Sequence, residues 1–179
     1  MNSEPRLICI IGAECTGKTT LAQALSARMG GLWVPEYLRH FTEVQGRTPE
    51  QHEQLSILQE QVRREATALE IAGEQPCAWV FCDTAPLLTA IYSDCMFADA
   101  SLYPPAHGLQ ARYALTLLLE PDIPWEADGL QRDGVLQRAT VHVRIEHTLA
   151  ERAWPHVRIA GSKEQRLLAA EKAVLSLTS

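Results

Sequence analysis

Residues 12–19 read Gly-Ala-Glu-Cys-Thr-Gly-Lys-Thr and match the phosphate-binding pattern G-x-x-x-x-G-K-[ST] at every fixed position. In this pattern two glycines allow a tight turn whose backbone N–H groups point inward and cradle an anion. The lysine reaches the β- and γ-phosphates, and the final hydroxyl can ligate Mg²⁺. The motif therefore predicts a nucleoside triphosphate site, which we expect to bind ATP with Mg²⁺. Its predicted contacts are Gly12, Ala13, Glu14, Cys15, Thr16, Gly17, Lys18, Thr19 and Thr20.

The segments that flank the loop support this prediction. Residues 7–11 form a short, mostly β-branched apolar run that is typical of a buried strand. After the loop, Leu21, Leu25 and Met29 are spaced as on one face of a helix, and Gly30 can end that helix. The order strand, loop, helix places the positive end of a helix dipole at the anion site.

Apolar runs and helical patterns alternate along the rest of the chain. Strands are predicted at 6–11, 32–36, 78–83, 114–119 and 157–161, with helices at 20–29, 49–72, 85–93, 138–152 and 163–177. The strands are continuous apolar runs, which favours a parallel sheet covered on both faces. We therefore expect a three-layer α/β fold, with a five-stranded parallel sheet and helices on both faces. Residues 1–179 would form a single domain that includes a short lid at about 121–138.

Two local patterns make more detailed predictions. Thr48 as N-cap, Pro49 and Gln51 predict a capping box at the start of the long helix to about residue 72. The spacing predicts that one face of this helix packs inward, and that face contains Leu55, Leu58, Val62, Ala66 and Leu69. Residues 94–110 contain two consecutive prolines and Gly108, so a break in regular structure is expected there.

Polar groups follow the predicted strands, at the edge of the sheet where ligands bind in folds of this kind. Asp83 closes an apolar strand and has the form of a Walker B carboxylate, which could hold Mg²⁺ opposite Thr19. Glu36 could orient an acceptor hydroxyl and take its proton, and Arg39 could pair with Glu36 or with a phosphate. The roles of the two carboxylates could also be exchanged. Gly161 and Ser162 follow the last strand and could contact adenine, although Ser162 is also a good helix N-cap.

The polar segment at 121–134 has the composition of a lid, because it is charged and punctuated by proline and glycine. Arg132 and Arg138 could move onto the phosphates and neutralise the charge that develops during phosphoryl transfer. Trp125 could stack on a planar ligand ring or pack beneath the loop. Tyr37 and Tyr92 are possible ligand contacts, although aromatic residues near strand ends more often belong to the core.

Composition and charge limit the range of partners. The formal net charge is −6 and no basic run occurs, which argues against nucleic acid or an anionic membrane as the main partner. Five cysteines without a C-x-x-C pair suggest reduced thiols, and neither a signal peptide nor a long apolar stretch is visible. We therefore expect a cytoplasmic protein that acts on a small molecule. The sequence indicates nothing about its oligomeric state.

Four segments, in order along the chain, resemble the NadR-type ribosylnicotinamide kinases, a group of P-loop kinase-like, AAA-type ATP-binding domains. They are residues 12–21, 34–39, 80–84, and 122–129 with Arg132 and Asp133. The resemblance implies transfer of the ATP γ-phosphate to the 5′-hydroxyl of nicotinamide riboside, which gives nicotinamide mononucleotide in NAD biosynthesis. It also implies that residues 36–39 and Asp122 to Asp128 line the acceptor site, with Trp125 near the nicotinamide. NadR proteins also carry an adenylyltransferase domain, whose H-x-G-H motif does not occur in this sequence.

Other functions remain as alternatives. The protein could phosphorylate another nucleoside or a nucleotide, or it could be an ATPase with a regulatory role. A guanine-specific switch is excluded, because its Asn-Lys-x-Asp segment needs an asparagine and Asn2 is the only one in the chain.

Overall fold

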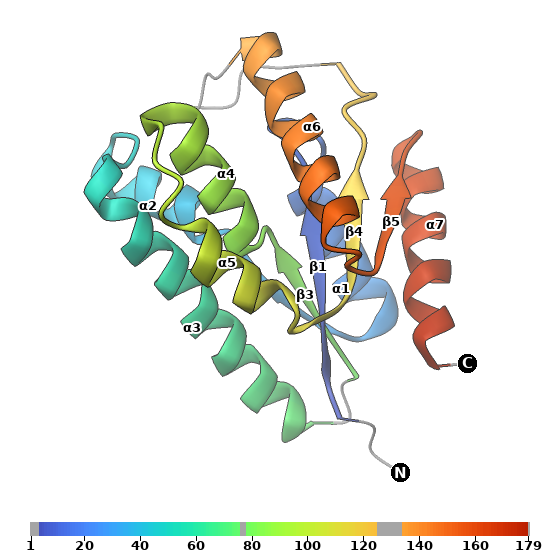
Figure 1. Ribbon diagram of the computed structural model, residues 1–179. Coiled ribbons are helices and arrows are strands. Elements are labelled where there is room, and N and C mark those ends of the chain that lie inside the picture. The colour runs from blue at the N-terminus through green and yellow to red at the C-terminus, as the bar shows by residue number, and fades with distance from the viewer. Residues whose placement is uncertain (1–3, 76–77, 125–133, 179) are drawn as a thin grey trace.

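The computed structural model describes residues 4–75, 78–124 and 134–178. Within these residues the strands form one five-stranded sheet in the order β2-β3-β1-β4-β5, and every neighbouring pair is parallel. The strands are β1 (Arg6–Ile11), β2 (Leu32–Val34), β3 (Trp79–Asp83), β4 (Tyr113–Leu119) and β5 (His156–Ile159). The central position of β1 places the loop that follows it between the ends of β3 and β4 (Figure 1). The predicted parallel sheet is confirmed.

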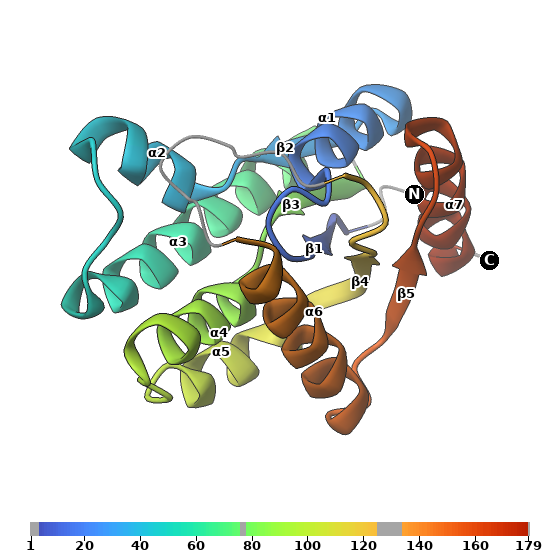
Figure 2. The ribbon, with the colours of Figure 1, turned by 90° about the horizontal axis from the view of Figure 1, so that it is seen from above.

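Helices cover both faces of this sheet, as Figure 2 shows from above. Helices α1 (Lys18–Met29) and α7 (Lys163–Leu175) pack on one face through Ile8 and Ile10 of β1. Helices α3 (Gln54–Gly73), α4 (Pro86–Phe97) and α6 (Gly134–Glu151) pack on the other through Leu7, Cys9 and Ile11. Two shorter helices, α2 (Tyr37–Gln45) and α5 (Tyr103–Gln110), and the 3₁₀ turns η1 (Gln51–Glu53) and η2 (Ser176–Thr178) complete the fold. The alternation of side chains along β1 thus divides the core into two apolar layers.

The start of the long helix differs from the prediction. The capping box is formed by Glu50 and Glu53 around η1, and not by Thr48 and Gln51. A carboxylate two residues further along serves equally well as an acceptor for the exposed N–H groups of the first turn. Pattern alone therefore misplaced this helix start by a few residues.

The packed face of α3 was predicted correctly only in part, because Leu58, Val62 and Leu69 pack inward but the other two predicted residues do not. Leu55 is 46% exposed and Ala66 is exposed, whereas Gln61 and Glu65 are buried beside Leu58. The two polar side chains are tolerated inside because they bond to each other and to neighbouring groups. Hydrophobic periodicity cannot reveal such a buried polar pair.

The segment 94–110 contains more helix than expected. Helix α4 continues to Phe97 and ends at Ala98, whose φ of 52° is left-handed. Helix α5 then begins at Tyr103 with the two prolines in its first turn, where a missing N–H costs nothing. The predicted break is therefore confined to the few residues between these two helices.

The ends of the other elements agree with the prediction to within a few residues, and Gly30 caps α1 in a left-handed conformation as expected. In the described part of the chain, no helix has both the length and the apolar character needed to span a bilayer.

Gly31, between α1 and β2, gives a stability test of this packing. A Cβ at Gly31 would lie 2.6 Å from Cε2 of Phe81 and 2.9 Å from the backbone oxygen of Trp79. Among the described atoms, a Cβ at Gly73 would meet nothing within 4 Å. We expect Gly31→Ala to lower the free energy of unfolding by about 1–3 kcal/mol, as overpacking does. Gly73→Ala, at the end of α3, should raise it by about 0.5–1 kcal/mol. Urea unfolding measures both, and equal effects would contradict the described packing.

Candidate nucleotide-binding and phosphoryl-transfer site

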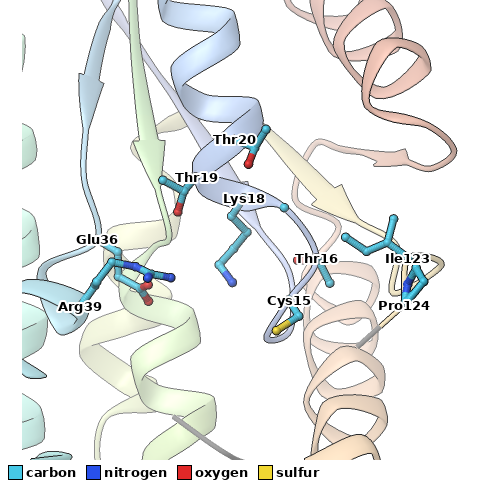
Figure 3. Close-up of a pocket in the computed structure, with 10 residues that line it drawn as sticks. Cys15, Thr16, Lys18, Thr19, Thr20, Glu36, Arg39, Ile123 and Pro124 are labelled. Carbon is cyan, nitrogen blue, oxygen red and sulfur yellow. The ribbon is translucent and has the colours of Figure 1, made fainter. Parts of the chain in front are cut away.

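A cavity of about 520 Å³ opens where the segments that follow β1, β2 and β4 meet (Figure 3). Side chains from the phosphate loop and the start of α1 form one wall, and the start of α2 and the segment after β4 face it. The described residues that line it are Cys15, Thr16, Gly17, Lys18, Thr19, Thr20, Glu36, Arg39, Ile123 and Pro124. Segments that lie far apart in the sequence therefore meet at a single pocket.

The loop after β1 has the compact form that its motif predicts. A Cβ at Gly12 would lie 2.6 Å from the Thr16 hydroxyl, so only glycine fits there without displacement. Gly17 has a φ of 83°, a left-handed conformation that favours glycine, and α1 begins at the next residue. The carbonyl of Ala13 accepts hydrogen bonds from the Thr16 hydroxyl at 2.9 Å and from Lys18 Nζ at 3.1 Å. The loop thus holds its lysine at the pocket, beside the positive end of α1.

Asp83 and Thr19 are joined by a side-chain hydrogen bond at the start of α1. The Thr19 hydroxyl donates to Asp83 Oδ2 at 2.6 Å, and Asp83 is 1% exposed. The other carboxylate oxygen, Oδ1, is buried and has no hydrogen-bond partner within the described residues. Burial, together with the nearby charge of Glu36, raises the pKa of Asp83 to about 6. A carboxylate and a hydroxyl placed in this way are the hard oxygen ligands that Mg²⁺ requires.

Glu36 lies between β2 and α2 with its side chain at the pocket (Figure 3). Its carboxylate accepts a hydrogen bond from the Thr84 hydroxyl at 3.2 Å. Thr84 follows Asp83 and has a φ of 81°, which is rare for a threonine, and its N–H donates to the Ile10 carbonyl at 2.9 Å. The strained residue therefore connects the two carboxylates of the site. The sequence contains no signal for this backbone conformation, so we did not predict a role for Thr84.

Two buried arginines hold the outer side of the phosphate loop. Arg138 Nη2 donates to the carbonyls of Cys15 and Ile123, at 3.1 and 3.0 Å. Arg166 Nη1 donates to the Thr16 carbonyl at 2.7 Å, and the rest of its guanidinium bonds to the turns after β4 and β5. Arg138 was predicted to act on phosphates, and in the structure it is bonded to the loop backbone. Arg166 was not predicted, because an arginine in a helical pattern is normally exposed.

Asp122 lies on the Arg166 side of the loop. Its carboxylate bonds to Arg166 and accepts the Gly161 N–H at 2.6 Å. Among the described residues it does not line the 520 Å³ cavity with Glu36, and its expected contact with an acceptor stays a prediction. The attraction of a buried guanidinium explains the position of this carboxylate.

A second, apolar cavity of about 150 Å³ lies between the starts of α1 and α7. Thr20, Leu21, Ile123, Lys163 and Leu167 are among its lining residues. Gly161 and Ser162, which we expected to contact adenine, do not line it in the described part of the chain. Ser162 instead caps α7 through a capping box with Gln165, as the alternative interpretation proposed.

Two other predicted contacts, Tyr37 and Tyr92, lie away from the cavity. The Arg64 guanidinium lies over the Tyr37 ring, with Cζ 4.6 Å from the ring centroid, and Tyr92 packs against the core. Neither lines the 520 Å³ cavity within the described ranges. Trp125, Asp128 and Arg132 fall outside the described residues, so their predicted roles are not addressed.

The buried carboxylate gives a stability prediction. The pKa of Asp83 rises from 3.8 to about 6 in the folded state, so folding favours the protonated carboxyl. The stability that this carboxyl supports is fully present below about pH 4 and is lost as the pH rises through 6. At about 1.4 kcal/mol per pKa unit, Asp83→Asn should raise the free energy of unfolding at pH 7.5 by on the order of 3 kcal/mol. The measurement is urea unfolding without nucleotide or divalent ion.

Two comparisons make this measurement specific to the buried carboxylate. The gain should shrink as the pH falls from 7.5 to 5, because the wild-type carboxyl then takes up its proton. Asp99 is half-buried, and hydrogen bonds from Ser101 lower its pKa, so Asp99→Asn should give no gain. A gain for Asp83→Asn that does not depend on pH would refute the electrostatic explanation.

Comparison with solved structures supports the fold. A NadR protein in complex with NR has a TM-score of 0.77 at 20% identity, over 98% of this chain and 52% of that chain. A NadR protein in complex with NAD and AMP-PNP has a TM-score of 0.78 at 21% identity, over 98% and 50%. Deoxyadenosine kinase from M. mycoides has a TM-score of 0.65 at 13% identity, over 95% of this chain and 99% of that chain. The chain therefore spans about half the length of the NadR chains that it matches. No curated protein matches the sequence.

The family model described as AAA domain matches residues 7–166 of the 179 residues. This range runs from β1 to the first turn of α7 and includes the phosphate loop, Glu36, Asp83 and Arg166. The chain therefore belongs to the AAA domain family, and it has the three-layer α/β fold of the P-loop kinases.

Proposed function

We propose that this protein is an ATP-dependent kinase that phosphorylates the 5′-hydroxyl of nicotinamide riboside, as part of NAD salvage in the cytoplasm. The observation that carries the proposal is the placement of Glu36 and Asp83. These two carboxylates lie beside one phosphate loop: Asp83 accepts a hydrogen bond from Thr19, and Glu36 accepts one from Thr84, the residue after Asp83. Phosphoryl transfer to an alcohol needs a metal-binding oxygen on the donor side and a proton acceptor on the other side.

The donor side uses the phosphate loop. The backbone N–H groups of the loop and Lys18 would hold the β- and γ-phosphates of ATP. Thr19 and Asp83 would hold Mg²⁺, which neutralises phosphate charge when it is bound. The hydrogen bond between these two residues and the buried Oδ1 of Asp83 support this assignment. The apolar cavity between α1 and α7 is the best candidate for the adenine ring.

The acceptor side uses Glu36 and Arg39, which line the same cavity from the start of α2. Glu36 would orient the 5′-hydroxyl and accept its proton, while Arg39 would contact the sugar or the transferred phosphoryl group. In the proposed lid, Trp125 and Asp128 would contact the nicotinamide riboside, and Arg132 would reach the phosphates. Complexes of NadR proteins with NR and with AMP-PNP support this choice of ligands.

A second candidate is a kinase for a different nucleoside or a nucleotide. Two further solved structures with this fold, deoxyadenosine kinase from M. mycoides and thymidylate kinase from Candida albicans, favour it. The segments 34–39 and 122–129, which resemble NadR-type kinases, favour nicotinamide riboside over these acceptors.

A panel of acceptors separates the two candidates. Purified protein with Mg-ATP is incubated in turn with nicotinamide riboside, deoxyadenosine, cytidine and thymidine monophosphate, and the initial rate of ADP formation is measured. We expect the highest kcat/KM for nicotinamide riboside, with nicotinamide mononucleotide as the product. A higher kcat/KM for any other acceptor would assign the protein to the second candidate.

A substitution at Glu36 tests the role proposed for it. Loss of a general base typically lowers kcat by about 10²–10⁴-fold, so Glu36→Gln should fall within this range. Glu43 lies on the same helix and is exposed, and Glu43→Gln should leave kcat within about twofold. If Glu36→Gln keeps kcat within about tenfold of the wild type, Glu36 is not the base.

A further inference from the structure

We propose that Gln61 is a positioning residue for Glu36, because it holds the first turn of α2 and thereby directs the Glu36 carboxylate to the pocket. The inference rests on the proposed function, in which Glu36 orients the acceptor hydroxyl. Gln61 is on α3 and, among the described residues, it does not line the cavity. It would act on the reaction only through the backbone of α2.

The start of α2 is capped in an unusual way. A helix leaves the N–H groups of its first turn without partners in the helix, and the side chain of the N-cap residue normally accepts one of them. Glu36 is the N-cap of α2, yet within the described residues its side chain makes no capping hydrogen bond. It accepts a bond from the Thr84 hydroxyl instead, at the edge of the pocket. The Tyr37 N–H donates to Gln61 Oε1 at 2.9 Å. A second helix thus takes over a capping interaction and leaves Glu36 directed at the pocket.

The orientation of Gln61 is itself determined by buried neighbours. Gln61 is 3% exposed, and its Nε2 donates to Glu65 Oε1 at 3.2 Å, which places the amide oxygen toward Tyr37. Glu65 is fully buried and accepts bonds from the Tyr113 hydroxyl at 2.9 Å and from Arg112 Nη2 at 2.7 Å. Satisfied buried networks of this kind have few alternative geometries. Residues at the start of β4 are therefore connected to the start of α2 by side-chain hydrogen bonds that pass through α3.

Another buried glutamine provides a matched control. Gln110 on α5 is 2% exposed, and its Nε2 donates to the Thr116 hydroxyl at 3.0 Å. Gln110→Met and Gln61→Met both remove a buried amide and keep similar side-chain length, but Gln110 Oε1 has no hydrogen-bond partner within the described residues. Gln110→Met should therefore lower stability less than Gln61→Met, and only Gln61→Met alters the start of α2.

The kinetic test is a double-substitution cycle with the acceptor that the wild type phosphorylates best. Gln61→Met should lower kcat by about tenfold or more, as misplacement of a catalytic group does, and should leave the KM for ATP within about twofold. Gln110→Met should leave kcat within about twofold. In the Glu36→Gln variant, the added Gln61→Met substitution should lower kcat by less than about twofold, because both substitutions remove the same function.

Three kinetic results would overturn the inference. One is an equal loss of kcat in the two methionine variants, which would indicate general destabilisation. The second is a loss of kcat in the double variant that equals the product of the losses caused by Gln61→Met and Glu36→Gln separately. The third is a loss that appears mainly in the KM for ATP.

Hydrogen exchange tests the structural part without any turnover. The Tyr37 amide should exchange slowly in the wild type and in Gln110→Met, and at least about tenfold faster in Gln61→Met. Equal exchange in the three proteins would overturn the inference. If the wild type phosphorylates no nucleoside, the proposed function fails on its own, and the exchange rates still decide whether Gln61 holds α2.

Discussion

Parallel pairing of β1 with β3 and with β4 is the constraint on which the rest of this structure depends. The pairing places Ile10 beside Asp83 and Ile11 beside Leu118, so the strands end at the same edge of the sheet. The phosphate loop follows β1 directly and therefore lies between the groups that follow β3 and β4. A shift of one residue between β1 and β3 would move Asp83 away from Thr19, since successive side chains point to opposite faces. The site is a consequence of strand register.

Two buried arginines bond to the carbonyl groups of the phosphate loop, whose N–H groups form the proposed anion site. Arg138 and Arg166 bond to the carbonyls of Cys15 and Thr16, and both also bond to the segment 120–124 after β4. Buried carbonyls need donors, and an arginine can satisfy several of them from one planar group. The two arginines therefore couple the shape of the loop to the start of the proposed lid.

Much of the fold and part of the site could be predicted from the sequence. Strong local patterns were sufficient to predict the five strands, the phosphate loop, and the positions of Lys18 and Thr19 in it. The positions of Asp83 and Glu36 also followed, because the carboxyl ends of parallel strands share one edge of the sheet. What could not be predicted depends on contacts between distant segments. Buried Gln61 and Glu65 interrupt the apolar face of α3, Asp122 turns toward Arg166, and Thr84 adopts a left-handed backbone.

The central claim is that the γ-phosphate of ATP moves to a nucleoside hydroxyl and not to water. The most direct measurement follows γ-labelled ATP in the presence of Mg²⁺ and nicotinamide riboside, and separates labelled nicotinamide mononucleotide from labelled inorganic phosphate. The account predicts that almost all released label appears in the mononucleotide and that release becomes slow when the nucleoside is omitted. Release into inorganic phosphate at the same rate with and without any nucleoside would contradict it, and would indicate an ATPase.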